Sequence, residues 1–345
     1  MESLFEKGRV VVILDPDRLF YFSGYRNPDA AMLLTEAGNF YCSDARVKEE
    51  ASACLPDGIA FVDADRGNYL ETLLNLSVLQ KSSRIGYEGD TVKMRDYLKI
   101  GGTGKPTEDV SVALNALRAV KSKRELRFIV KAQGVTDTVF GEVVPLLREG
   151  VSEREIAAAI HTAIAQRGGE LAFDTIVAFG ENTAKPHAHP SDRVLRYGDP
   201  VTLDFGAKID GYCSDMTRSL CLGTPSARYA AWYGYVLQAQ ELALKGVRAG
   251  MTGAACDEIA RSSFRKEGLE PYFTHSLGHS LGIAIHESPV LSPRETKVIP
   301  AGAVLSVEPG LYLPGVFGIR IEDIVVFENN GADNLTKSPK HLIIL

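Results

Sequence analysis

Carboxylates occur in strand-like apolar surroundings at four places in the second half of the sequence. Asp204 and Glu308 each come near the end of an apolar run, and Asp215 and Glu322 each lie on the strand expected next along the chain. An ionised carboxylate is costly to bury unless an opposite charge or hydrogen bonds replace its lost hydration. A salt bridge or a turn position would explain any one of these residues. For four together in matching contexts, the better explanation is a divalent cation that they share.

Five of the seven histidines cluster in two short segments. His275, His279 and His286 lie within twelve residues of one another, in a segment interrupted by glycines that let the backbone pack closely around a site. His187 and His189 belong to a Pro-His-Ala-His-Pro string upstream. The sequence therefore predicts that imidazoles join the carboxylates in one site. The other two histidines are interpreted as structural.

Four carboxylates and one imidazole make an oxygen-rich ligand set. Such a set suits Mn, Co(II) or Fe(II) better than a thiolate-type zinc site does, and the number of ligands indicates two ions. Paired ions acidify a bridging water and hold both the attacked carbonyl oxygen and the nucleophile, which allows amide hydrolysis without a covalent intermediate. The sequence contains no G-x-S-x-G elbow, and no cysteine lies in a recognisable catalytic motif. The chemistry expected is metal-assisted hydrolysis.

A faint internal repeat provides elements that could position these residues. Arg148–Ser152 recurs as Arg248–Thr252, and each copy ends at a candidate helix N-cap. The strand-like segment Gly198–Gly206 likewise aligns with Gly302–Gly310, and in each copy a carboxylate stands two residues before the final glycine. Two similar halves would thus each contribute one acidic strand to a common site.

The first third of the chain has a different pattern. Short β-like runs alternate with helix-like stretches, which is typical of a small α/β domain, and two strand-like runs flank a turn as in a hairpin. The β-like runs are Val10–Leu14, Ile59–Asp63 and Ile85–Glu88; the helix-like stretches are Val47–Leu55, Tyr69–Gln80 and Thr91–Ile100; the hairpin strands are Ala31–Leu34 and Asn39–Ser43. We expect a first domain over residues 1–108 and a second over residues 109–345, with the transition at about 101–123.

Composition and charge exclude several classes of protein. The net charge of -6 and the dispersed basic residues argue against nucleic-acid binding, and the densest basic group, Lys121, Lys123 and Arg124, is interpreted as a solvated helix end. No apolar stretch reaches the roughly 18 residues of a membrane span. The charged N-terminus, Met1–Arg9, does not resemble a secretory signal, so a cytoplasmic location is expected. The five scattered cysteines are interpreted as small buried hydrophobes.

Four strings of the sequence together resemble metallopeptidase family M24, and within it the Xaa-Pro dipeptidases (prolidases) and Xaa-Pro aminopeptidases. The strings are Asp204–Arg218, Gly278–Glu287, Glu308–Tyr312 and Gly318–Asp323. Tyr21–Gly24 and Ser43–Arg46 resemble the creatinase-like N-terminal domain of that family, so the resemblance covers nearly the whole chain. It implies an α+β pita-bread catalytic domain with two pseudo-twofold halves, preceded by a small α/β creatinase-like domain.

The resemblance also implies a metal-binding role for five residues. Asp204 would bind one ion, and His279 and Glu308 the other. Asp215 and Glu322 would bridge the two. The ions are expected to be two divalent metals, manganese first, with Co, Fe or Zn as alternatives.

Further residues are implied to act on the substrate or to support the ligands. Glu308 would guide the proton of the bridging water, while His187 and His286 would contact the scissile carbonyl or the leaving amine. The remaining candidates, which would support the ligands or position the substrate, are Arg320, Tyr312, His275 and Tyr212.

The expected activity is that of an exopeptidase that hydrolyses the bond between an N-terminal residue and a following proline. Short proline-containing peptides would be the substrates, and the chain is expected to form a homodimer. One alternative is an enzyme of the same fold that acts on a non-peptide or non-proline substrate. Another is a binding module without catalysis. The complete set of ligands weighs against both, but the sequence does not distinguish a dipeptidase from an aminopeptidase.

Overall fold

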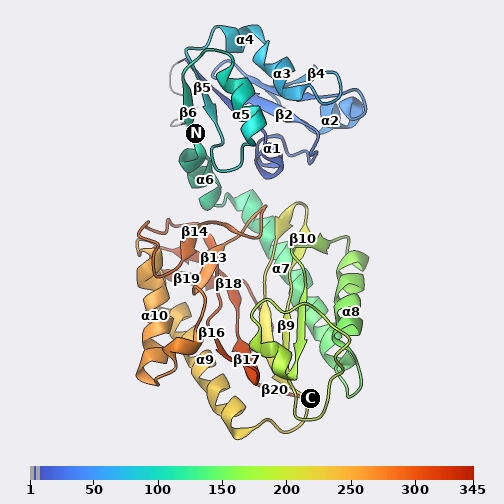
Figure 1. Cartoon of the computed structure of the whole chain (residues 1–345), viewed down its shortest axis with the longest axis vertical. Coiled ribbons are helices and arrows are strands. Elements are labelled where there is room, and N and C mark those ends of the chain that lie inside the picture. The colour runs from blue at the N-terminus through green and yellow to red at the C-terminus, as the bar shows by residue number, and fades with distance from the viewer. Residues whose placement is uncertain (1–3, 5–7) are drawn as a thin grey trace. The chain divides into compact units, whose positions relative to one another are not determined.

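The computed structural model describes Leu4 and residues 8–345 (Figure 1). Most of the charged N-terminal segment, Met1–Arg9, on which the expected cytoplasmic location rests, lies outside the described residues. The chain divides into two compact units, residues 1–118 and residues 119–345. The division falls inside the 101–123 interval, and it places the helix that follows Asp109 with the first unit.

The first unit is built on a six-stranded mixed sheet of order β4-β3-β2-β1-β5-β6. Strand β2 runs antiparallel to β1 and β3, whereas the other neighbouring pairs are parallel. The strands are β1 (Arg9–Ile13), β2 (Ala31–Leu34), β3 (Asn39–Ser43), β4 (Ile59–Asp63), β5 (Arg84–Tyr87) and β6 (Thr107–Asp109). The helices are α1 (Pro16–Ser23), α2 (Lys48–Cys54), α3 (Tyr69–Leu74), α4 (Ser77–Gln80), α5 (Met94–Gly101) and α6 (Ser111–Ala119). The predicted hairpin is confirmed as β2 and β3.

One predicted helix of this unit is wrong in its extent. The stretch Tyr69–Gln80 forms two helices, because α3 ends at the C-cap Asn75 and Leu76 adopts an extended backbone with ψ of 139°. Asparagine bonds readily to nearby backbone groups and is therefore unfavourable inside a helix, which explains the interruption.

The second unit contains two main sheets of similar topology. Their orders are β20-β12-β9-β8 and β14-β13-β15-β18-β19, and two smaller sheets, β11-β10-β7 and β16-β17, complete the unit. In chain order its first half comprises α7 (Lys123–Val143), η1 (Val144–Leu146), α8 (Glu153–Gln166), β7 (Glu170–Leu171), β8 (Ile176–Phe179), η2 (Gly180–Ala184), β9 (Pro200–Asp204), β10 (Ala207–Ile209), β11 (Tyr212–Cys213) and β12 (Thr217–Cys221).

The second half of this unit has the corresponding elements. It comprises α9 (Ala227–Gly246), α10 (Gly253–Lys266), η3 (Glu270–Tyr272), β13 (Gly278–Ser280), β14 (Glu287–Leu291), β15 (Val304–Val307), β16 (Gly310–Leu313), β17 (Phe317–Arg320), β18 (Asp323–Glu328), β19 (Gly331–Asn334) and β20 (Ile343–Ile344). Within the unit as drawn in Figure 1, α8 and α10 lie on opposite sides, with the strands between them.

The two halves correspond strand by strand, as the sequence repeat predicted. Strands β8, β9 and β12 are consecutive antiparallel neighbours in one sheet, as β13, β15 and β18 are in the other. Ser152 caps α8 and Thr252 caps α10, and each cap residue forms an antiparallel bridge, to Val194 and Val298 respectively. Each half also has its own apolar core between its helices and its sheet. The pair of similar halves is therefore confirmed.

The predicted burial of the cysteines is confirmed at four of the five positions. Cys42, Cys213, Cys221 and Cys256 are buried, as interpreted. Cys54 is exposed at the end of α2, so the interpretation is wrong there.

Within residue 4 and residues 8–345, no helix has the length and apolar character that a membrane span requires.

Candidate active site

The four acidic side chains of the predicted metal site lie where strands end. Asp204 is the last residue of β9, and Glu308 directly follows β15. Asp215 lies between β11 and β12, and Glu322 lies between β17 and β18, so their expected positions within strands are wrong. Asp215, Glu308 and Glu322 thus lie outside the strands, where the direction of a side chain is not tied to the alternation of a strand.

Antiparallel pairing places these strand ends side by side in each half. In the first half, Asp204 is paired with Thr217, two residues after Asp215. In the second half, the residue before Glu308 is paired with the residue after Glu322. The two registers differ by two residues, but in each half the antiparallel pairing brings the two carboxylates close together across neighbouring strands.

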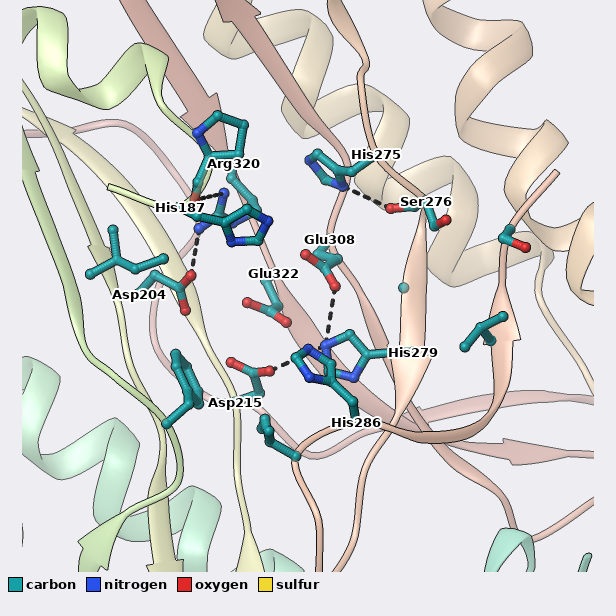
Figure 2. A pocket seen from close by; sticks show the side chains of 17 residues that line it. His187, Asp204, Asp215, His275, Ser276, His279, His286, Glu308, Arg320 and Glu322 are labelled. Atoms are coloured by element: carbon teal, nitrogen blue, oxygen red, sulfur yellow. Dashed lines mark hydrogen bonds and ion pairs between the residues drawn. The ribbon is translucent and has the colours of Figure 1, made fainter. Parts of the chain in front are cut away.

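One pocket of about 450 Å³ collects most of the predicted site residues. Its lining includes nine of them: Asp204, Asp215, His279, Glu308, Glu322, His187, His275, His286 and Arg320. Figure 2 shows the carboxylates of the cluster turned toward one another, with His279 at one side of them. Apolar side chains, among them Phe173, Ile176 and Ile285, form other parts of the wall. The mixture of apolar walls and convergent polar groups is typical of a small-molecule or peptide site.

Short distances define the centre of the pocket. Nε2 of His279 lies 3.5 Å from Oδ2 of Asp215 and 3.4 Å from Oε1 of Glu308. Ligand atoms of Asp215, His279 and Glu322 all lie within 4.8 Å of one another. One ion could therefore be reached by groups from both halves of the second unit.

The carboxylates of the cluster have little positive charge around them. Burial, followed by repulsion from Asp204 and Glu308, raises the pKa of Asp215 well above its ordinary value, and burial followed by repulsion from Asp215 does the same for Glu322. Burial also raises the pKa of Glu308. Among the described residues that line the pocket, Arg320 is the only cationic side chain other than the histidines.

Two buried oxygens of the cluster support the same conclusion. Oδ1 of Asp204 and Oδ1 of Asp215 have no hydrogen-bond partner within the described part of the chain. Buried carboxylate oxygens normally accept hydrogen bonds or bind cations. The residues present therefore fit divalent metal ions, which would neutralise the cluster and bind these oxygens.

Two hydroxyl groups that sequence reasoning missed orient the carboxylates. Thr217 Oγ1 donates to Oε2 of Glu322 at 2.6 Å, and Ser306 Oγ donates to Oε1 of Glu308 at 3.0 Å. Supports of this kind fix the direction of metal ligands. The sequence contains a signal for Ser306, because it is a polar residue within an apolar strand. In the structure this residue of β15 is fully buried.

Arg320 links the cluster to two predicted support residues. Its Nη2 donates to Oδ2 of Asp204, and its Nη1 donates to the hydroxyl of Tyr312 at 2.6 Å. That hydroxyl lies 3.0 Å from Nε2 of His275, whose Nδ1 lies 2.8 Å from the carbonyl oxygen of Ser276. Burial, followed by the charge of Arg320, lowers the pKa of His275 to about 3, so the ring is neutral at ordinary pH and accepts from Tyr312.

The two other histidines of the pocket are more exposed than the central one. His187 and His286 are exposed, whereas His279 is partly buried. The rings of His286 and His279 are in contact, with centroids 4.4 Å apart. Burial, followed by the neighbouring His279 and His187, lowers the pKa of His286, which favours a neutral ring that can donate one N–H.

Two predicted residues lie outside the pocket lining. Tyr312 stands behind Arg320, where it can support the site without lining it. Tyr212 is not brought to the pocket, because its ring stacks on Phe128 with centroids 5.4 Å apart. His189 of the Pro-His-Ala-His-Pro string is also absent from the lining and is exposed.

A buried ion pair holds the segment that carries His286. Nζ of Lys121 lies 2.8 Å from Oε2 of Glu287, and the two side chains are only 2% and 5% exposed. The other carboxylate oxygen of Glu287 accepts the backbone N–H of Ala284 at 3.1 Å. The same glutamate therefore closes the turn before His286 and pairs with Lys121.

The interpretation of Lys121 as part of a solvated helix end is wrong. Lys123 and Arg124 are exposed, as expected, but Lys121 precedes the N-cap of α7 and belongs to the backbone that pairs with the second half. Its N–H donates to the carbonyl of Gly302 at 2.9 Å. Because of this pairing, Lys121 is buried in the protein interior just before α7 begins.

We expect Lys121→Met to lower the free energy of unfolding by roughly 3–5 kcal/mol, because the Glu287 carboxylate would stay buried without its cation. Urea unfolding measures the change. Lys123→Met is the matched control, since that exposed lysine should alter stability by less than about 0.5 kcal/mol. Equal, small effects of the two substitutions would contradict a structural role for the buried pair.

Comparison with known proteins agrees with this geometry. Residues 127–329 match the model of metallopeptidase family M24, and residues 7–120 match that of the creatinase/prolidase N-terminal domain. The Xaa-Pro dipeptidase of Pyrococcus furiosus is 37% identical over 268 residues, which cover 77% of each chain.

Solved structures give the same result over the full length. An Xaa-Pro dipeptidase from Bacillus anthracis superimposes with a TM-score of 0.95 and is 32% identical, covering 100% of this chain and 98% of its own. An X-Pro aminopeptidase from Thermotoga maritima does so with a TM-score of 0.91 and 32% identity, covering 100% and 97%. The chain belongs to metallopeptidase family M24, with a creatinase-type N-terminal domain and a pita-bread catalytic domain.

Proposed function

We propose that this peptidase is a metal-dependent exopeptidase that hydrolyses the bond between an N-terminal residue and a following proline. The observation that carries the proposal is the cluster of four carboxylates and His279 at the centre of one pocket. The Xaa-Pro peptidases among the relatives support proline as the second residue of the substrate. We further propose, on the family resemblance alone, that the chain acts as a homodimer.

The proposed metal site holds two divalent ions. Asp204 would hold one ion, and His279 and Glu308 the other. Asp215 and Glu322 would be shared, in keeping with their central positions. Manganese is the first candidate because the ligand set is rich in hard oxygen donors. When bound, such a pair supplies a hydrolytic nucleophile at neutral pH and polarises the scissile carbonyl.

The protein's own groups would move the protons and position the peptide. Glu308, held by the hydroxyl of Ser306, would accept the proton of the attacking water and return it to the leaving nitrogen. His187 and His286, exposed in the pocket, would donate hydrogen bonds to the scissile carbonyl or to the leaving amine. Arg320 would hold Asp204 and the Tyr312–His275 pair in place.

Both a dipeptidase and an aminopeptidase are compatible with this proposal, and both names occur among the relatives. The two activities differ in whether the residue after proline is present. A panel of Xaa-Pro dipeptides and Xaa-Pro-Yaa tripeptides, assayed with Mn or Co, assigns the chain to one of them. A substrate outside both sets would favour the alternative of a non-proline or non-peptide substrate.

Exhaustive chelation is expected to abolish peptide hydrolysis, because the site would lose the ions that supply the nucleophile and polarise the scissile carbonyl. Addition of Mn or Co should restore the activity, with metal content approaching two ions per chain. Metal analysis and the rate are measured on the same samples. Full activity of metal-free protein would contradict the proposed mechanism.

Peptides with proline as the second residue should be cleaved faster than otherwise identical peptides with alanine there. The metal cluster alone would serve hydrolysis of many peptides, so this preference tests the proline assignment separately. Values of kcat/KM for matched Xaa-Pro and Xaa-Ala peptides decide it. A clear preference for N-terminal methionine in longer peptides would overturn the assignment while leaving the hydrolase intact.

His286→Ala is expected to lower kcat by roughly 10²- to 10⁴-fold, since it removes a donor to charge that develops during the reaction. Bound metal should stay near the wild-type level because the residue is not assigned as a ligand. His161→Ala, an exposed histidine on α8 outside the pocket, is the control and should leave kcat unchanged. Near-normal turnover of His286→Ala would remove it from the catalytic groups, and loss of metal would make it a ligand.

A further inference from the structure

Glu153 is a buried carboxylate whose side-chain partners are all neutral donors from one segment, residues 179–191. Its side chain is fully buried at the first position of α8. Oε1 accepts the N–H of Phe179 at 2.7 Å and an amide N–H of Asn182 at 3.0 Å. Oε2 accepts the N–H of Ser191 at 2.9 Å and its hydroxyl at 2.5 Å.

These contacts join the two ends of the segment that carries His187. Phe179 is the last residue of β8, and Ser191 lies at the far end of the loop that follows. One carboxylate therefore accepts hydrogen bonds from both ends of this loop. The first backbone N–H groups of α8 add to this anchor, since those of Glu153 and Arg154 donate to carbonyls of Arg193 and Ser191 at 3.1 and 3.2 Å. His187 lies between the two ends and lines the pocket.

The middle of the same segment is attached to the second half. Thr183 Oγ1 accepts the N–H of Gly318 at 2.9 Å, and Nη1 of Arg320 donates to the carbonyl of Pro186 at 3.2 Å. The only regular element inside the segment is the short η2 helix. Its shape therefore depends on anchors outside it, and Glu153 supplies the anchor for both ends.

The internal duplication shows that a helix start at this place does not need a carboxylate. The capping residues Ser152 and Thr252 correspond, so the position equivalent to Glu153 in the second half is Gly253. A side chain at Gly253 would collide with backbone, because its Cβ would lie 2.2 Å from the carbonyl oxygen of Val290. The glutamate is thus particular to the half that carries the His187 segment.

We propose that Glu153 is a positioning residue for His187, acting through the four hydrogen bonds that hold the ends of residues 179–191. The proposal rests on the proposed hydrolysis, in which His187 contacts the substrate. A glutamine at this position would keep the size of the side chain but present two N–H groups toward donors. At least part of the anchor would then be lost, and a displacement of His187 by even about 1 Å is enough to impair a positioned group.

The test is a double-mutant cycle of Glu153→Gln and His187→Ala, assayed with an Xaa-Pro peptide the wild type cleaves. Glu153→Gln should lower kcat/KM about tenfold or more in the wild-type background. In the His187→Ala background the same substitution should change it less than about twofold, because coupled residues are not additive. Glu155→Gln is the matched control, since that exposed glutamate on the same helix bonds only to Ser152.

Hydrogen exchange of the metal-free proteins provides a readout that does not depend on activity. Amides of residues 180–191 should exchange about tenfold faster in Glu153→Gln than in wild type, while those of β15 keep their protection. If Glu153→Gln does not fold, Ser191→Ala removes one of the four bonds and should show the same pattern with smaller changes.

The outcomes separate this proposal from the proposed function. An equal loss of kcat/KM in both backgrounds, or unchanged exchange of residues 180–191, would overturn the role of Glu153. A wild-type protein that cleaves no Xaa-Pro peptide would instead contradict the proposed function, and faster exchange in that case would still support the anchor.

Discussion

Repulsion among four carboxylates gathered in one pocket is the constraint on which the rest of the second unit depends. Burial and mutual repulsion raise the pKa values of Asp215 and Glu322, and the one arginine of the lining pairs with Asp204. Hydroxyl groups of Thr217 and Ser306 donate hydrogen bonds that orient two of the carboxylates without neutralising their charge. Such a cluster is expensive to keep together in the absence of cations. Its retention in a folded core indicates that metal binding, rather than stability of the bare chain, explains the arrangement.

The duplicated sheet topology brings the four carboxylates together. Each half delivers two carboxylates through a pair of antiparallel strands, so neither half alone forms the site. The halves differ in what they add around the cluster. The second contributes His279 and the turn with His286, which the Lys121–Glu287 pair secures. The first contributes the His187 segment, which Glu153 secures.

Much of the candidate site could be predicted from the sequence because its signal is local. A carboxylate at the end of an apolar strand is unusual by itself, and the repetition of that pattern in two halves is enough to single out Asp204 and Glu308. The hairpin of β2 and β3 was equally local, since two strand-like runs flank a turn. These features can be predicted from residues that are close together in the sequence.

The remainder depends on tertiary contacts between distant segments. Lys121 carries the composition of a solvated helix end, yet its backbone pairs with the second half and its side chain is buried. Glu153 resembles any acidic residue in the first turn of a helix until the loop that it holds is in place. Tyr212 shares its sequence string with two proposed metal ligands, but its ring packs on Phe128 instead of lining the pocket. In each case side-chain direction, which short-range patterns do not encode, decided the outcome.

The carboxylate cluster and His279 are proposed to hold two metal ions. Anomalous diffraction from crystals of the protein grown with manganese tests this proposal most directly, because the signal locates the ions independently of activity. Two peaks are expected in the pocket, roughly 3.5–4 Å apart as in two-metal hydrolases, with Asp215 and Glu322 in contact with both. A single peak, or manganese bound away from these carboxylates, would contradict the proposal.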